Sequence, residues 1–516
     1  MGTFLAWTFT ASILMVAGRT AADEVVFLNG DRLTGKIVIV ADGELVLATE
    51  TAGRVTIKLG KVKTFSSDGP LKIRLKDKAP VDSKVTAGPP GKVKTDAWPE
   101  PVPIKEITAI NPHAPYALYR HENAFHDSEH SWYDLDAPTS PDYELDEMFE
   151  PHTGMFKSPL DPAINWLLDQ QRRLETNTGL RVGFAYTHLF QQASGGPGER
   201  WATAGDADLL FDWTLIGRGT ENIGRLFFSV EERFRAFSDI TPSEMRSQIG
   251  SLVNVGGPFN DRGPVVRDLF WEQRLLDAKL RVILGRGAPD DYLGSHALQS
   301  ANFGFINGNL AGNVTMAFPG HGPLAVLSVH PTEIFYANAV GANAYSVTTE
   351  SSLDRLFDEG QIYGAGEVGV TPEIEALGAG RYAVTGWNMP GRELEGLPSD
   401  WGVNFTIEQY LLERLWVYGR YGYSDVGLNG VQNAYQAALS VDGLLGSPDN
   451  ITGIGFGYAV PSDSSLRDEK SAEIFHRFQL TQHTQFSIGA QAIMNPANAP
   501  TRDVVGVFSF RLRFTL

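Results

Sequence analysis

The sequence of 516 residues contains no cysteine, which excludes disulfide bonds and metal sites built on thiolates. It also lacks any apolar run as long as the roughly 20 residues that a membrane-spanning helix needs. The longest such run, residues 4–18, is followed by Thr20-Ala21-Ala22. A short apolar run before small residues is typical of a secretory signal peptide. We therefore expect residues 1–22 to be removed, which leads to an oxidising compartment such as the periplasm.

Strict alternation marks the last stretch of the chain, residues 504–516. From Phe508 to Leu516, apolar residues occupy every second position and Ser509, Arg511 and Arg513 lie between them. Because successive side chains of a strand point to opposite faces, this strand has one apolar face and one face with two arginines. It fits either a soluble sandwich with the apolar face inside or an outer-membrane barrel with that face toward lipid.

Sixteen short strand-like segments, the last stretch among them, follow Gly179, with turn clusters between them. The predicted strands are 180–190, 205–216, 223–234, 266–276, 279–286, 323–330, 332–341, 361–370, 380–389, 401–411, 415–425, 433–443, 450–460, 469–480, 484–494 and 503–516. Their connections alternate between long links, such as 235–265 and 287–322, and tight ones, such as Pro331. Alternating long and short links are typical of a bacterial outer-membrane barrel. The sequence therefore predicts an all-β fold, a 16-stranded antiparallel transmembrane β-barrel over residues 179–516 with a small N-terminal β domain.

The small N-terminal β domain, residues 23–112, contains two degenerate repeats. VVFLNGDRLTGKIV from Val25 corresponds to LKIRLKDKAPVDSKV from Leu71, and VTIKLGKVKTF from Val55 corresponds to VPIKEITAI from Val102. The NGDRLTG piece resembles the small β module found in front of some outer-membrane barrels, and it is also similar to an Sm-type fold. Two roles stay open, a periplasmic binding module and a spacer without a ligand. Binding to nucleic acid is excluded by the compartment.

An acidic stretch at residues 113–160 is interrupted by prolines. Such a composition buries too little apolar surface to offset the entropy of ordering, so we expect a flexible linker. A group of histidines and acids in it is an alternative metal site, but nothing fixes its geometry and we assign no metal ligands. This group consists of His121, Glu122, His126, Asp127, Glu129 and His130. The next segment, residues 161–178, predicts a helix at the periplasmic mouth of the barrel.

Several segments of residues 179–516 resemble the carbohydrate-selective porin family of the OprB type. They are VVRDLFWEQRLLDAKLRVILGR (265–286), SANFGFIN (300–307), LFDEG (356–360), EIFHRFQLTQH (473–483), AIMNPA (492–497) and the closing VFSFRLRFTL. The resemblance implies a sixteen-stranded barrel that passes sugars by facilitated diffusion.

The sequence offers little for catalysis or cofactor binding. GAGEVG at 364–369 matches a dinucleotide fingerprint on paper, but Pro372 follows where the motif needs a helix. No nucleophile and base stand at a recognisable spacing. We therefore expect neither an enzyme nor a bound cofactor or metal.

Charged and polar side chains on the predicted lumen faces are the candidate pore lining and sugar-binding residues. The link 287–322 adds acids, amides and aromatic rings, and we expect it to turn into the lumen and narrow the pore. The candidates are Arg225, Glu231, Arg233, Glu272, Arg274, Arg281, Asp290, Asp291, Tyr292, Asn302 and Phe303. Mixed charges would suit sugar hydroxyls, although each residue can equally belong to a solvated wall or a stiffening salt bridge.

The predicted function is an outer-membrane porin for carbohydrates and other small solutes, with outer-membrane lipid around it and the N-terminal module in the periplasm. The alternative is a structural protein with a plugged barrel. In that case the N-terminal module and the acidic linker would bind cations or a cell-wall polymer such as peptidoglycan. The net charge of −18 is compatible with the alternative.

Overall fold

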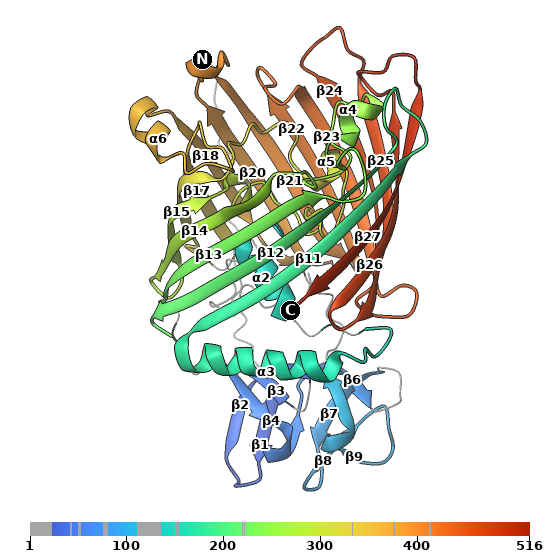
Figure 1. Ribbon diagram of the computed structural model, residues 1–516. Helices are drawn as coiled ribbons and strands as arrows, with labels where there is room; N and C mark the ends of the chain where they lie inside the picture. Colours follow the sequence, from blue (N-terminus) through green and yellow to red (C-terminus); the bar gives the residue numbers. More distant parts are fainter. Residues whose placement is uncertain are drawn as a thin grey trace, which may run out of the picture. The chain divides into compact units, whose positions relative to one another are not determined.

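The computed structural model describes two compact units, within residues 1–113 and 114–516, and each is considered by itself (Figure 1). The described residues are 23–110 and 136–516, except 42–43, 50–52, 76–80, 150, 151, 153, 219, 221, 333, 375–376 and 412–413. The predicted signal peptide and the histidine and acid group at 121–130 lie outside them.

The first unit is built from short antiparallel strands. They are β1 (Asp23–Phe27), β2 (Arg32–Ala41), β3 (Glu44–Thr49), β4 (Gly53–Lys58), β5 (Val62–Ser66), β6 (Pro70–Leu75), β7 (Val81–Ala87), β8 (Lys92–Thr95), β9 (Val102–Pro103) and β10 (Ile107–Ile110). Each half ends in the same way, with a strand, a 3-10 turn and a strand: β4, η1 (Leu59–Lys61) and β5, then β9, η2 (Ile104–Glu106) and β10. The two halves share one core, because β10 pairs with both β2 and β6.

The second unit is a closed antiparallel barrel. Its strands are β11 (Leu180–Ala193), β12 (Trp201–Ile216), β13 (Gly224–Arg235), β14 (Gly263–Leu275), β15 (Leu280–Gly287), β16 (Gly322–Val329), β17 (Phe335–Asn343), β18 (Ile362–Val370), β20 (Gly378–Met389), β21 (Asp400–Leu411), β22 (Leu415–Ser424), β23 (Val431–Asp442), β24 (Ile451–Pro461), β25 (Glu469–Thr481), β26 (Thr484–Met494) and β27 (Val504–Thr515), with the two-residue β19 (Glu373–Ile374) beside β20. The predicted sixteen-stranded fold is confirmed, and every predicted boundary lies within 4 residues of the observed one.

Closure of the barrel joins its first and last strands. β11 pairs with β27 from Ala185↔Thr515 to Ala193↔Val507. On β27 the side chains of Phe508, Phe510 and Leu512 are about half exposed, whereas Arg511 and Arg513 are buried. The apolar face therefore points outward and the arginines point into the lumen, as alternation requires.

The outer face carries an apolar band. Exposed side chains on the strands include Leu209, Trp213, Leu269, Leu284, Leu327, Val368, Val384, Phe405, Ile407, Leu439, Ile454, Phe456, Ile474 and Ile488. A soluble protein would bury such a band, whereas lipid favours it. Among the described residues, no helix has both the length and the hydropathy to cross a membrane.

Helices of the second unit are short apart from α3 (Asp161–Thr178), which covers the predicted range. The others are α2 (Pro141–Phe149), α4 (Met245–Ile249), α5 (Gly308–Ala311) and α6 (Leu353–Glu359), with 3-10 turns η3 (Pro289–Asp291) and η4 (Glu393–Glu395). The position of α2 differs from expectation. It lies in the acidic stretch predicted to be a flexible linker, yet most of its residues are buried against the inner wall of the barrel (Figure 1).

Candidate functional site

The α2 segment, defined here as residues 136–149, sits inside the barrel with its acidic side chains on the wall. Asp136, Asp142, Glu144 and Glu147 are at most 3% exposed. Leu145 and Met148 pack toward Gly183 of β11, where an added Cβ would lie 2.5 Å from Leu145. Glycine at this wall position thus leaves the room that α2 needs.

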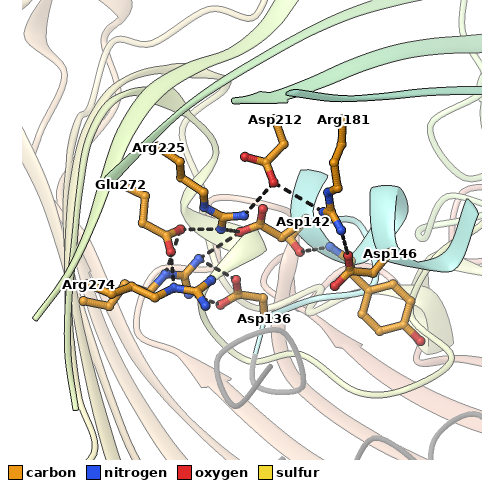
Figure 2. A network of polar contacts seen from close by, with 11 residues as sticks. Asp136, Asp142, Asp146, Arg181, Asp212, Arg225, Glu272 and Arg274 are labelled. Atoms are coloured by element: carbon orange, nitrogen blue, oxygen red, sulfur yellow. Dashed lines mark hydrogen bonds and ion pairs between the residues drawn. The ribbon is translucent and has the colours of Figure 1, made fainter. Parts of the chain in front are cut away.

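A hub of charges holds one side of the α2 segment (Figure 2). Arg225 of β13 donates to Asp142 at 2.5 Å, to Glu272 at 2.7 Å and to Asp212 at 3.1 Å. Arg281 of β15 forms a bidentate pair with Asp136, with distances of 2.9 and 2.8 Å. Bidentate arginine–carboxylate pairs are among the strongest and most directional side-chain contacts.

Two further arginines complete this hub. Arg274 donates to Glu272 at 2.6 Å. Arg181 of β11 donates to Asp146 at 2.8 Å and lies 3.3 Å from Asp212. The hub therefore joins four arginines of β11, β13, β14 and β15 to carboxylates of the wall and of the α2 segment (Figure 2).

The opposite side of the α2 segment has two more pairs. Arg267 of β14 donates to Glu144 at 3.0 Å and also to the carbonyl of Thr139. Arg513 of β27 donates to Glu147 at 3.0 Å. Acidic groups on several faces of one short helix thus meet arginines from five strands around the barrel.

A β-bulge explains how Arg267 reaches the lumen. The register between β13 and β14 shifts between Ser229 and Val230. Arg267 and its neighbour Asp268 are both buried, at 6% and 0% exposure, although regular alternation would send one of them outward. Bulges commonly redirect a side chain in this way.

Burial raises the pKa of the acids in the α2 segment, whereas the neighbouring arginines lower it. Burial, countered only in part by Arg225 and Arg281, raises the pKa of Asp142 to about 7. Burial also raises the pKa of Asp136 and of Glu144. For Glu147, burial acts against the effect of Arg513 and His152, which together hold its pKa below the usual range.

The long link 287–322 also lies in the lumen, as predicted. Its backbone N–H groups donate to inward-facing carboxylates: Gly294 to Glu367 at 2.7 Å and Asn307 to Glu473 at 2.8 Å. Gly294 has a φ of 59°, a conformation that favours glycine. The link is therefore fixed to the wall through its main chain.

The α2 segment contacts both this link and the predicted arginine wall. The rings of Tyr143 in α2 and Phe303 in the link are stacked at 5.9 Å, and Arg281 lies 5.4 Å from the ring centre of Tyr292. We expected the link to lie opposite Arg225, Glu231, Arg233, Glu272 and Arg274. The structure adds that Asp142 of the α2 segment contacts Arg225.

The remaining candidates occupy several environments. Glu231 pairs with Arg233 and Arg262, and Arg233 donates to Asp206 at 3.1 Å. Asp291 accepts from Thr139 at 3.0 Å. Asn302 and Phe303 are buried, at 6% and 3% exposure, so they contact protein in this state.

A small cavity remains beside the α2 segment. It holds about 50 Å³ of space for water, which corresponds to a few water molecules at ~10–15 Å³ each. Its lining includes Tyr143, Phe303, Trp416, Glu147 and Arg477.

Two groups in the described residues have spacing that suits a metal ion: Asp268, Asp291 and His321, and Asp206, Asp208 and Glu231. In both groups, arginines form ion pairs with the acids. Arg267 lies 3.6 Å from Asp268 and 3.7 Å from Asp291. Arg233 forms ion pairs with Asp206 and Glu231. These contacts support a role for both groups as ion-pair clusters of the wall.

Sequence reasoning did not include among the candidates the ion-paired side chains whose partners lie far away in the chain. These are Asp136, Asp142, Glu144, Asp146 and Glu147, with Arg181, Arg267 and Arg513 on the wall. Strand parity could have identified Arg181, and it had already placed Arg513 on the polar face of the last strand. The bulge hid Arg267, and composition alone made the acids look solvated.

Residues 243–516 match the family described as "Carbohydrate-selective porin, OprB family". Porin AaxA of Chlamydia muridarum is 22% identical over 285 residues, which cover 53% of this chain and 61% of that protein, less than two thirds of its length.

Solved structures of the barrel type also match. The high-pH structure of Pseudomonas putida OprB has a TM-score of 0.56 and 14% identity, and the match covers 68% of this chain and 97% of that one. Its low-pH structure has a TM-score of 0.45 and 12% identity, covering 71% and 100%. The first of these supports the barrel fold. The family match spans more than half of the sequence, and its members are channels rather than enzymes, in agreement with the prediction. The chain belongs to the carbohydrate-selective porin family of the OprB type.

Proposed function

We propose that this outer-membrane barrel allows facilitated diffusion of carbohydrates and other small solutes. The observation that carries the proposal is the inner wall, where buried arginines and carboxylates lie together on the strands of a closed barrel of a sugar-porin family. Arginine donates to sugar hydroxyls and carboxylates accept from them, so a mixed wall offers a solute continuous hydrogen-bond partners. Selectivity then follows from pore width and the lining groups.

The link 287–322 and the predicted lining residues form the narrow part of the pore in this proposal. The set is Arg225, Glu231, Arg233, Glu272, Arg274, Arg281, Asp290, Asp291, Tyr292, Asn302 and Phe303. The main-chain anchoring of the link to Glu367 and Glu473 supports a fixed constriction. The N-terminal module would then lie in the periplasm.

Planar bilayers test the function directly. The full chain should give steady conductance steps that maltose or glucose reduces. A variant with Asp142, Glu144 and Glu147 changed to Asn, Gln and Gln, which weakens the hold on α2, should conduct more. If neither protein forms pores, the diffusion function is wrong.

One observation favours the alternative function as an envelope tether with a plugged barrel. The α2 segment and the link 287–322 both lie inside the barrel, and the cavity beside α2 holds about 50 Å³ of space for water. The tether would act through the N-terminal module, with peptidoglycan as its candidate partner. Deleting residues 23–110 should abolish co-sedimentation with cell-wall sacculi if the tether is right. A porin should keep its conductance after the same deletion.

A further inference from the structure

We infer that the arginine hub is a binding site for carboxylated sugars, and that the α2 segment occupies this site as an internal substitute for such a solute. The inference rests on the proposed diffusion function and names its substrate class. It concerns the wall formed by Arg181, Arg225 and Arg274 (Figure 2), together with Arg281, which pairs with Asp136.

The chemistry of the α2 segment is that of an anionic ligand. Between Asp136 and Phe149 the chain has five acidic residues and no lysine or arginine. Each of the five carboxylates contacts a wall arginine, on β11, β13, β14, β15 or β27. The wall thus recognises a ligand through its carboxylates. A carboxylated saccharide offers the same planar acceptor to the same donors.

The side facing the hub supplies the second half of a sugar site. Tyr292 lies against Arg281, and Phe303 stacks on Tyr143 of α2. If α2 moves away, a solute next to the hub arginines also meets the ring of Tyr292, whereas the ring of Phe303 lies against Arg513 on the opposite side. Aromatic faces pack well on the apolar face of a pyranose, while carboxylates and hydroxyls pair with arginine. The combination suits an acidic sugar better than an inorganic anion.

The α2 helix is suited to being displaced. It has nine residues, and an isolated helix shorter than about 12 residues is marginal in water. Its ion pairs can be exchanged for those of a solute with similar groups. A solute that supplies carboxylates to the hub therefore replaces the contacts that α2 loses. Binding of such a solute shifts the equilibrium toward the state in which α2 is displaced.

Gly183 allows α2 to be displaced without changing any charge. A side chain at this position would collide with Leu145 and Met148, at 2.5 and 2.7 Å from its Cβ. Gly183→Leu should therefore push α2 off the wall. Gly386→Leu on β20 is the matched control, because its Cβ has open space around it.

The test measures conductance, reversal potential and sugar block of the full chain in planar bilayers. Gly183→Leu should conduct more than the parent, prefer anions, and be blocked by trigalacturonate about tenfold more tightly than by neutral maltotriose. Gly386→Leu should behave like the parent. Adding Arg225→Ala and Arg281→Ala to Gly183→Leu should remove both the anion preference and the difference between the two sugars.

Two results separate the inference from the porin function. If Gly183→Leu opens pores that trigalacturonate and maltotriose block equally, the carboxylated-sugar site is wrong and the diffusion function stands. If the triple acidic variant opens pores without anion preference, the inference is also overturned. If no variant forms a pore although heat-modifiable migration shows a folded barrel, the diffusion function itself fails.

Discussion

Arg225 of β13 donates to Asp142 of α2 at 2.5 Å, although 83 positions separate them in the chain. Both side chains are buried, at 1% exposure each. Arg225 also holds Asp212 and Glu272, so this one guanidinium joins the barrel wall to the helix inside it. In such a place the guanidinium charge of Arg225 is stable because the carboxylates around it neutralise it.

Removing Arg225 should therefore destabilise the barrel strongly. Arg225→Ala leaves three carboxylates near one another without their shared cation, and loss of one partner of a buried pair costs about 3–5 kcal/mol. Urea unfolding in detergent micelles, followed by tryptophan fluorescence, measures the change. Arg235→Ala is the control, since Arg235 is exposed and lies 3.8 Å from Asp261, and an exposed pair contributes about 1 kcal/mol at most. Equal losses for the two variants would contradict the central role of Arg225.

The proposed constriction predicts an effect on ion preference. Replacing Arg225 and Arg233 together with alanine removes two lumen cations while their carboxylate partners remain. We expect ion preference to shift toward cations and the sugar block to weaken, as measured by reversal potential and sugar titration in bilayers. Unchanged conductance, ion preference and sugar block would place the constriction elsewhere, with the porin assignment intact.

The pKa of Asp142 predicts how pH affects the docking of α2. Burial raises this pKa from 3.8 to about 7, with Arg225, Arg281, Glu272 and Asp212 facing the carboxyl. Between these two pKa values, Asp142 keeps its proton while α2 is docked, whereas Asp142 of the released segment has lost its proton. By linkage, docking weakens as pH rises from about 4 to about 7 and then levels off.

Conductance should accordingly increase between pH 5 and pH 7.5. Glu147 does not oppose the trend, because its pKa lies below the usual range, so it stays charged throughout. Asp142→Asn removes one titrating group and should reduce the increase, while Asp136 and Glu144, whose pKa values burial also raises, still contribute in the same direction. A conductance that falls over this range in the parent chain would be inconsistent with release of α2.

Much of the barrel could be predicted from the sequence because each strand carries its own signal. Alternation on β27 separates Phe510 from Arg511 without reference to any other strand, and turn residues bound each segment. The fold of residues 136–149 carries no such local signal. Its acids are buried only because arginines on distant strands neutralise them, and this information lies outside the segment itself.

The candidate site was predictable to the same extent. Parity placed Arg225, Glu272 and Arg281 on the inner face, where the structure has them. Their partners were not predictable, since Asp142 and Asp136 lie in a stretch whose composition favours disorder. The inward direction of Arg267 was not predicted for another reason. Arg267 lies at a bulge, where the strand departs from the alternation on which the prediction was based.

The anchoring of the link 287–322 gives the last prediction. Glu473 of β25 accepts from the backbone N–H groups of Ile306 at 2.9 Å and Asn307 at 2.8 Å, and it is 2% exposed. Glu473→Leu removes both acceptors and leaves two buried donors unpaired, at a cost of about 1–3 kcal/mol each. The link should then leave the wall near residue 306, which widens the pore. We expect a larger single-channel conductance and a weaker sugar block.

Glu473→Gln controls for charge, because its amide oxygen still accepts from one of the two N–H groups. Its conductance should lie between those of the parent and Glu473→Leu. Protease should cleave the link more readily in Glu473→Gln than in the parent, and most readily in Glu473→Leu. Mass spectrometry of the fragments released from intact proteoliposomes measures this cleavage. If Glu473→Leu conducts and resists protease like the parent, the contacts to Glu473 do not hold the link, and its contact with Glu367 through Gly294 must hold it instead.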